Sequence, residues 1–295
     1  MSKNSKKIGN RKDARLCSDI TGMSQICIDL KPNRCDSDVY INQKIDVTKL
    51  MEYMKKKKDE GSDLTFFHAI VTAVGKVFYN RNKLNRFVSN RHIYEHNDVV
   101  VSFVAKVSFD DKSEEMMIMV PIEPKDNIDT ISKKISGYVD KVRNSKHVEK
   151  EGANDAIDIV GKLPNPIRIP LVGILKWCDK KGILPKFLVK DNLYYSSIIL
   201  SNLGSIKCGA IYHNLTCFGT CSSLATIGEI KNEDIHHDDG TEEIRKLCEF
   251  GINLDERIAD GYYFAKSVKL LQHILENPEL LEEDASTKID LGENR

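Results

Sequence analysis

The spacing of apolar residues changes repeatedly along this chain, and this change constrains the fold more than any other feature of the sequence. Residues 38–46 alternate between apolar and polar side chains, as in a strand, whereas the apolar residues from Val47 to Met54 share one face of a helix. Asp46 is a plausible N-terminal cap for this helix, and Gly61 is a plausible stop. The sequence therefore predicts a strand followed directly by a helix.

Both spacings recur downstream, but strands and helices do not alternate strictly. Helical spacing and proline punctuation predict helices within residues 64–78, 128–142, 164–188 and 259–276. Strand-like runs occupy residues 116–123, 196–202, 222–230 and 247–254, and residues 86–109 are expected to form two strands around a turn at Glu95–Asp98. The connection 143–158 is charged and poor in apolar residues. This order predicts an α+β sandwich in which one large sheet is flanked by helices.

The charges of the chain balance, with 44 basic and 44 acidic residues among 295. The balance gives no reason to expect binding to nucleic acid or to a membrane. The longest apolar run, YYSSIILSNL, is much shorter than the ~20 residues of a membrane-spanning helix, and the basic N-terminus lacks the apolar core of a secretory signal. We therefore expect a cytoplasmic protein.

The eight cysteines are scattered along the chain and do not form the paired spacing of a zinc site. The nearest pair, Cys217 and Cys221, has three residues between its members, and no second pair follows it. Free thiols in a reducing compartment fit this distribution best. We expect no metal.

An unusual density of charge marks the stretch LDERIADG, where an expected strand meets the last expected helix. Asp255, Glu256, Arg257 and Asp260 lie within six residues, directly before Gly261. Such a turn is either a solvated corner of the protein or part of a catalytic site. Asp260 in particular is well placed to cap the helix that follows.

An ordered series of segments resembles the catalytic domain of the 2-oxo acid dehydrogenase acyltransferase component, which shares its fold with chloramphenicol acetyltransferase. The segments are DVYINQKIDVTKL, LTFFHAIVTAVGKVF, LNRFVSNRHIYEHNDVVVSFVA, IILSNLGSI, SSLATIGEI and LDERIADGYYFAKSVKLLQHILENPELL. The resemblance covers roughly residues 38–281. It implies a chloramphenicol acetyltransferase-like two-layer sandwich with a mixed sheet, a homotrimer with active sites between subunits, and acyl transfer from coenzyme A.

The resemblance also implies roles for individual residues. Acyl transfer needs a base that deprotonates a thiol or hydroxyl and a donor that stabilises a tetrahedral oxyanion. The family supplies the base as the histidine of His-x-x-x-Asp-Gly and the donor as a serine, and here Ser201 matches the serine in LSNLGS. Asp260 and Gly261 also match, with Asp260 expected to brace the turn through an ion pair, but Glu256 stands in place of the histidine.

This substitution leaves three hypotheses open. A thiol has an ordinary pKa of about 8.5 and a glutamic acid about 4.3, so proton transfer between them is unfavourable by roughly 6 kcal/mol unless burial retunes the carboxylate. In the first hypothesis, Glu256 is retuned and acts as the base. In the second, another residue supplies the base, with His213 and the pair His236–His237 as candidates. In the third hypothesis the fold persists without turnover, as a binding or regulatory protein.

The resemblance suggests three regions in the chain. Residues 1–37 form an N-terminal extension, 38–281 an acyltransferase-like domain, and 282–295 an acidic tail that composition predicts to be disordered. The extension is too short for a lipoyl domain, so we expect no lipoyl group on this chain and a stand-alone enzyme with a small-molecule or thiol acceptor. Residues 162–193 are expected to shape an acceptor pocket or to pack against another subunit, with Trp177 covering the core or a pocket.

Overall fold

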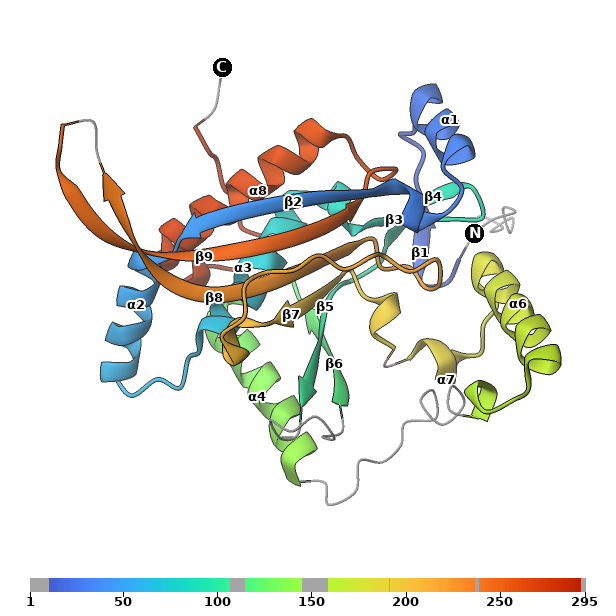
Figure 1. Ribbon diagram of the computed structural model, residues 1–295, viewed down its shortest axis with the longest axis horizontal. Coiled ribbons are helices and arrows are strands. Elements are labelled where there is room, and N and C mark those ends of the chain that lie inside the picture. The colour runs from blue at the N-terminus through green and yellow to red at the C-terminus, as the bar shows by residue number, and fades with distance from the viewer. Residues whose placement is uncertain (1–10, 107–114, 145–158, 191, 237–238, 293–295) are drawn as a thin grey trace, which may run out of the picture.

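A mixed six-stranded sheet forms the centre of the computed structural model, which describes residues 11–106, 115–144, 159–190, 192–236 and 239–292 (Figure 1). Its strands, in spatial order, are β2 (Asp38–Asp46), β9 (Glu242–Asp255), β8 (Ser223–His236), β7 (Ile198–Asn202), β5 (Val99–Lys106) and β6 (Glu115–Ile122). The pairs β5–β7 and β7–β8 are parallel, and the remaining neighbours are antiparallel. The expected mixed sheet is confirmed.

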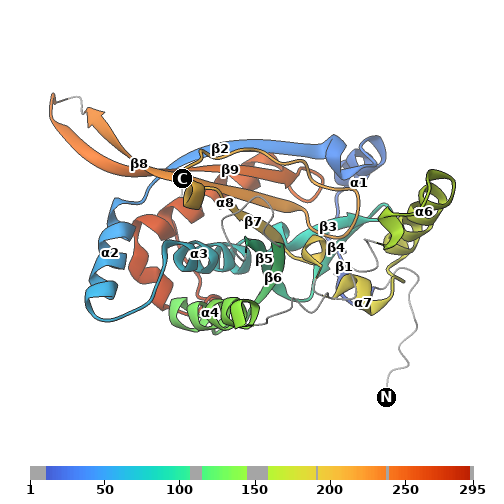
Figure 2. The ribbon, with the colours of Figure 1, turned by 60° about the horizontal axis from the view of Figure 1, so that its bottom comes forward.

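Four helices cover one face of this sheet, as Figure 2 shows. They are α2 (Thr48–Asp59), α3 (Phe66–Asn80), α4 (Ile128–Asn144) and α8 (Gly261–Glu276). Alternate residues of the central strands point toward these helices, so that Leu200, Ile227 and Phe250 are buried against Ile70 and Phe264. Each such side chain contributes about 1.5–3 kcal/mol when it leaves water. The predicted two-layer arrangement therefore follows because the apolar face of the sheet and the apolar faces of the helices leave water by packing together.

The ends of α2 and α8 lie near the sequence signals, but the N-cap of α2 is Val47 and not the expected Asp46. The Asp46 carboxylate accepts a hydrogen bond from the Thr48 backbone N–H at 2.8 Å, and Gly61 adopts a positive φ of 87° beyond the end of α2. Helix α8 has Asp260 as its N-cap and Asn277 as its C-cap, and Pro278 starts the short 3-10 helix Pro278–Glu282. The predicted strand-to-helix connections are confirmed.

A smaller antiparallel sheet contains two strands joined by a turn that the sequence analysis did not predict. Residues 86–106 form three strands, not the two expected around Glu95–Asp98: β3 (Arg86–Ser89), β4 (His92–His96) and β5. Asn90 and Arg91 both have positive φ, of 48° and 63°, and form the additional two-residue turn. Strand β1 (Ala14–Leu16) pairs with β4, so the N-terminal extension contributes to this sheet.

Strands β8 and β9 are longer than the expected 222–230 and 247–254. Beyond a register shift between Ile227 and Ile230 they continue as a two-stranded arm, from Lys231–Leu247 pairing to His236–Glu242 pairing. This arm extends past the other strands in Figure 1. The residues of this arm are mostly polar and lack apolar alternation, so their sequence does not predict strands.

Two further expectations are wrong. Residues 283–292 of the acidic tail are ordered against α3: Ala285 is fully buried, and the buried Lys76 ammonium donates to the carbonyls of Glu283 and Asp284 at 3.1 and 2.7 Å. The acidic composition of this segment predicts disorder, but hydrogen bonds to its backbone carbonyls fix it against α3. Trp177 covers no core, since its side chain is 56% exposed.

The remaining helices lie outside the two layers. Helix α1 (Gly22–Leu30) belongs to the N-terminal extension, and α6 (Asn165–Lys181) and α7 (Lys186–Val189) belong to the proline-rich segment. Short 3-10 helices span Arg34–Ser37, Asn82–Asn85, Leu193–Tyr195 and Gly204–Ile206. The charged connection 145–158 lies outside the described residues.

Candidate active site

The charged turn between β9 and α8 is braced by a buried ion pair. Arg257 donates from Nε and Nη2 to the two carboxylate oxygens of Asp255, at 2.8 and 2.7 Å, and both side chains are almost fully buried. The Nε of Arg34 lies 3.7 Å from the same carboxylate. A two-pronged arrangement of this kind fixes direction as well as charge. The sequence analysis expected Asp260 to brace the turn, but this ion pair is on Asp255.

Asp260 has the simpler role that its position before a helix allows. Its Oδ1 accepts a hydrogen bond from the Tyr263 backbone N–H at 2.8 Å, and among the described residues its carboxylate makes no ion pair. It is therefore the N-cap of α8.

Glu256 lies on the solvent side of the turn. Its Oε1 is 2.6 Å from the Lys31 Nζ, and its side chain is 41% exposed. Its backbone N–H donates to the Ser37 carbonyl at 2.9 Å. Arg257, the neighbour that could have clamped it, binds Asp255 instead. The carboxylate is thus accessible but paired with a lysine from the N-terminal extension.

Glu256 and Asp260 line one cavity of about 480 Å³, between the N-terminal extension and the turn. Residues 19–27 form one wall, including Thr21, Met23 and Cys27 of the α1 region. Lys83 and Arg86 supply positive charge, although Arg86 is paired: its Nη2 lies 2.7 Å from the Asp19 Oδ2 in the same cavity and its Nε 3.9 Å from the Glu95 Oε2. The cavity therefore combines an accessible carboxylate with cations.

Ser201 lies away from this cavity in a single copy of the chain. It pairs with Thr226 on β8, which pairs with Gly251 on β9. Glu256 is five residues beyond Gly251, so at about 3.3 Å per residue the two positions are offset by roughly 17 Å along the strands. Ser201 is half-buried at the end of β7 and lines no cavity with Glu256.

The alternative bases differ in their surroundings. His213 is exposed, and its backbone N–H donates to the Asn253 Oδ1 at 3.3 Å. Its loop crosses the sheet face opposite the helices, where Ile211 hydrogen-bonds with Thr226, the partner of Ser201. His213 is therefore on the same face of the sheet as Ser201. His236 pairs with Glu242 at 2.9 Å on the exposed arm, and His237 lies outside the described residues.

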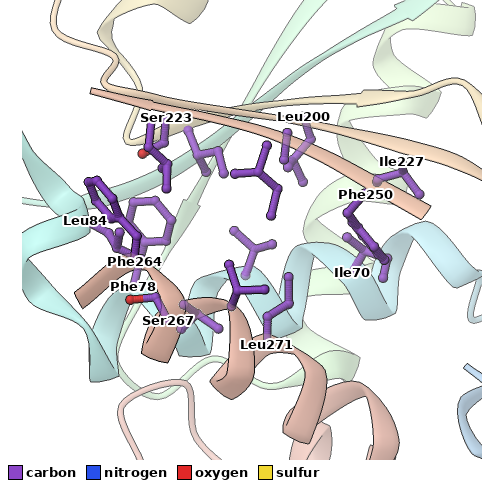
Figure 3. A pocket seen from close by; sticks show the side chains of 17 residues that line it. Ile70, Phe78, Leu84, Leu200, Ser223, Ile227, Phe250, Phe264, Ser267 and Leu271 are labelled. Carbon is purple, nitrogen blue, oxygen red and sulfur yellow. The ribbon is translucent and has the colours of Figure 1, made fainter. Parts of the chain in front are cut away.

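A second cavity lies between the sheet and helices α3 and α8 (Figure 3). It measures about 50 Å³, and among the residues that the structure describes its lining contains no ionisable side chain, with Ser223 and Ser267 as the only polar members. It cannot supply acid–base chemistry. Among the described residues, moreover, no cluster of histidine, cysteine and carboxylate side chains could hold a metal ion.

No family model and no curated protein matches the sequence. Solved structures do match. A probable dihydrolipoamide acetyltransferase from Listeria monocytogenes is 17% identical with a TM-score of 0.57, over 88% of this chain and 93% of that one. The core of a pyruvate dehydrogenase complex is 12% identical with a TM-score of 0.58, over 88% of each chain.

A chloramphenicol acetyltransferase is 11% identical, with a TM-score of 0.53 over 89% of this chain and 99% of that one. The chain has the chloramphenicol acetyltransferase-like fold. This result confirms the expected fold, and at these identities the likeness extends to the fold alone. Helix α1 contributes to the wall of the cavity beside Glu256. The sequence analysis did not predict this helix, although Met23, Ile26 and Leu30 have helical spacing.

Proposed function

We propose that this protein transfers an acyl group between coenzyme A and a thiol or hydroxyl acceptor, with Glu256 as the base. The proposal rests on one observation: Glu256, Lys83 and Arg86 line the same cavity. Coenzyme A is polyanionic, and the Lys83 ammonium in the wall of the cavity is a cation suited to a phosphate oxygen. The fold, which acetyltransferases share, supports the same assignment.

The Lys31–Glu256 ion pair is compatible with a catalytic carboxylate. Both side chains are about two-fifths exposed. Exposed ion pairs contribute only about 0–1 kcal/mol, so an acceptor can displace the ammonium at little cost. Glu256 is 41% exposed in a single copy, so the burial that would suit it to a thiol has to come from the neighbouring copy of the homotrimer proposed below. In the reaction the acceptor's S–H or O–H proton passes to Glu256 as the nucleophile attacks the thioester carbonyl. The C–S bond then breaks, and the carboxylic acid returns the proton to the departing coenzyme A thiolate.

Ser201 is proposed as the oxyanion donor, supplied by a neighbouring copy. The roughly 17 Å offset within one chain excludes direct cooperation there. A homotrimer with sites between subunits, as the family resemblance implies, removes that obstacle. If Glu256 is not the base, His213 is the alternative on the face that carries Ser201.

Calorimetric titration with coenzyme A tests whether the cavity binds this substrate. Lys83→Met should weaken binding several-fold, since it removes a charge from the wall of the cavity. Lys49→Met, at an exposed position of α2, removes the same charge elsewhere and should bind normally. Equal affinity in the two variants would remove the cavity from the proposal.

A second function is a coenzyme A-binding or regulatory protein without turnover. The ion pair favours it, because Lys31 occupies the oxygen that must accept a proton. If coenzyme A binds but no tested acceptor releases the coenzyme A thiol from acetyl-coenzyme A, the result supports the second function. Release of the thiol supports the first.

A further inference from the structure

Helix α6 is attached to the body of the protein by one side only. The Asp179 carboxylate accepts hydrogen bonds from the Tyr195 hydroxyl at 2.7 Å and from the Gly219 backbone N–H at 2.9 Å. Arg11 donates to the Asp179 carbonyl at 3.0 Å, and Gly182, in the left-handed conformation, ends the helix. These contacts fix which face of α6 points inward.

The outward face of α6 carries an apolar stripe. Ile167, Ile174 and Trp177 are 56%, 58% and 56% exposed. With Pro170 they recur at i, i+3, i+7 and i+10, which places them along one side of the helix. Beyond the helix, Ile183 and Phe187 are 58% and 56% exposed. A contiguous exposed apolar surface of this kind marks an interaction site.

Figures 1 and 2 show α6 at the edge of the molecule, outside both layers of the fold. Helix α6 therefore lies apart from the helices that cover the sheet.

The segment that carries the stripe is rich in basic residues. Residues 159–190 contain Asp179 as their single acidic residue, and its carboxylate is buried in the attachment. The same residues contain seven basic side chains, which are Lys162, Arg168, Lys176, Lys180, Lys181, Lys186 and Lys190. The chain as a whole is neutral, so this concentration of charge is local.

We propose that α6 and residues 182–190 bind the surface of a bilayer that contains anionic lipids. Helices that lie in the membrane interface combine large apolar residues and tryptophan with lysines on the polar side. An interface between protein copies is a poorer match for this segment, because lysine is depleted at the cores of such interfaces. None of the described helices has the length and apolar content to span a bilayer, so the contact is peripheral. The proposal departs from the expectation of no membrane partner, which rested on overall charge.

The fluorescence of Trp177 tests the proposal directly, since it is the only tryptophan in the chain. Adding vesicles of phosphatidylcholine with phosphatidylserine to the full chain should shift its emission to shorter wavelength. Vesicles of phosphatidylcholine alone should give a much smaller shift, and high salt should reverse the shift with the anionic vesicles. Ile174→Asp should weaken vesicle binding by about tenfold or more, since it places a charge where the bound protein would insert an apolar side chain into the bilayer.

Ile244→Asp is the matched control, because Ile244 is 68% exposed on the arm of β9, away from α6. It should bind vesicles like the unmodified protein. Unchanged Trp177 emission with anionic vesicles would overturn the proposal, as would equal losses in the two aspartate variants. Short-wavelength emission without vesicles, in an oligomer that Ile174→Asp dissociates, would assign the stripe to a second copy and also overturn it.

Discussion

Lys31 Nζ lies 2.6 Å from Glu256 Oε1 and joins the N-terminal extension to the turn before α8. Lys31 directly follows α1, which forms a wall of the cavity beside Glu256. The extension therefore contacts the carboxylate and lines the cavity beside it.

Lys31→Met frees the carboxylate without altering it. If the ammonium only competes with the acceptor, kcat/KM for thiol release from acetyl-coenzyme A should rise by up to about fivefold, the equivalent of roughly 1 kcal/mol for an exposed pair. A steady-state thiol assay measures the effect. A rate that falls as far as that of a variant lacking the carboxylate would show that Lys31 takes part in the reaction.

Asp255→Asn removes one partner of a buried ion pair and leaves the Arg257 guanidinium without its counter-charge. The free energy of unfolding should fall by about 3–5 kcal/mol, because an unpaired buried charge is costly. Urea titration measures it. A loss below 1 kcal/mol would show that the turn does not depend on this pair.

Asp260 should behave as a cap and not as a charge. Asp260→Asn keeps an oxygen that can accept the Tyr263 N–H, so stability and acyl transfer should both be retained. Asp260→Ala should lower the free energy of unfolding by about 1 kcal/mol. Loss of acyl transfer in Asp260→Asn, with normal stability, would instead require its negative charge in catalysis.

His96 should make stability depend on pH. Burial lowers the pKa of His96 from 6.5 to about 4, and its ring nitrogens lie 3.0 Å from the Asn85 carbonyl and 2.9 Å from the Thr220 hydroxyl. The unfolded chain binds a proton near pH 6.5 and the folded protein only near 4, so stability is complete above pH 6.5 and falls as pH drops toward 4. The contribution of His96 is up to about 3 kcal/mol over this range.

Urea unfolding at several pH values between 7 and 4 measures this dependence, and His96→Gln isolates it from other acid-sensitive groups. The two proteins should differ in slope between pH 6.5 and 4. Parallel pH profiles would show that His96 is protonated as easily in the folded state as in the unfolded one.

Apolar periodicity predicted the elements whose faces meet in the core. The strand 38–46, helix α3 and helix α8 were found because each has one face that must be buried. Elements held by other forces were missed: the Asn90–Arg91 turn depends on backbone conformation, and the β8–β9 arm depends on backbone pairing.

The site was predictable in part. Sequence order placed Glu256 and Asp260 in one turn, and they line one cavity. The Lys31–Glu256 pair joins residues 225 positions apart, so no local pattern could indicate it. The Asp255–Arg257 pair had a local signal, because alternate residues of an extended segment face the same side.

The central claim is that Glu256 accepts the proton of the attacking nucleophile. Glu256→Gln removes the basic oxygen at nearly equal volume, and thiol release from acetyl-coenzyme A with candidate acceptors should fall by about 10²–10⁴-fold relative to the unmodified protein. Equal rates in the two proteins would contradict the claim and leave the fold without its proposed base.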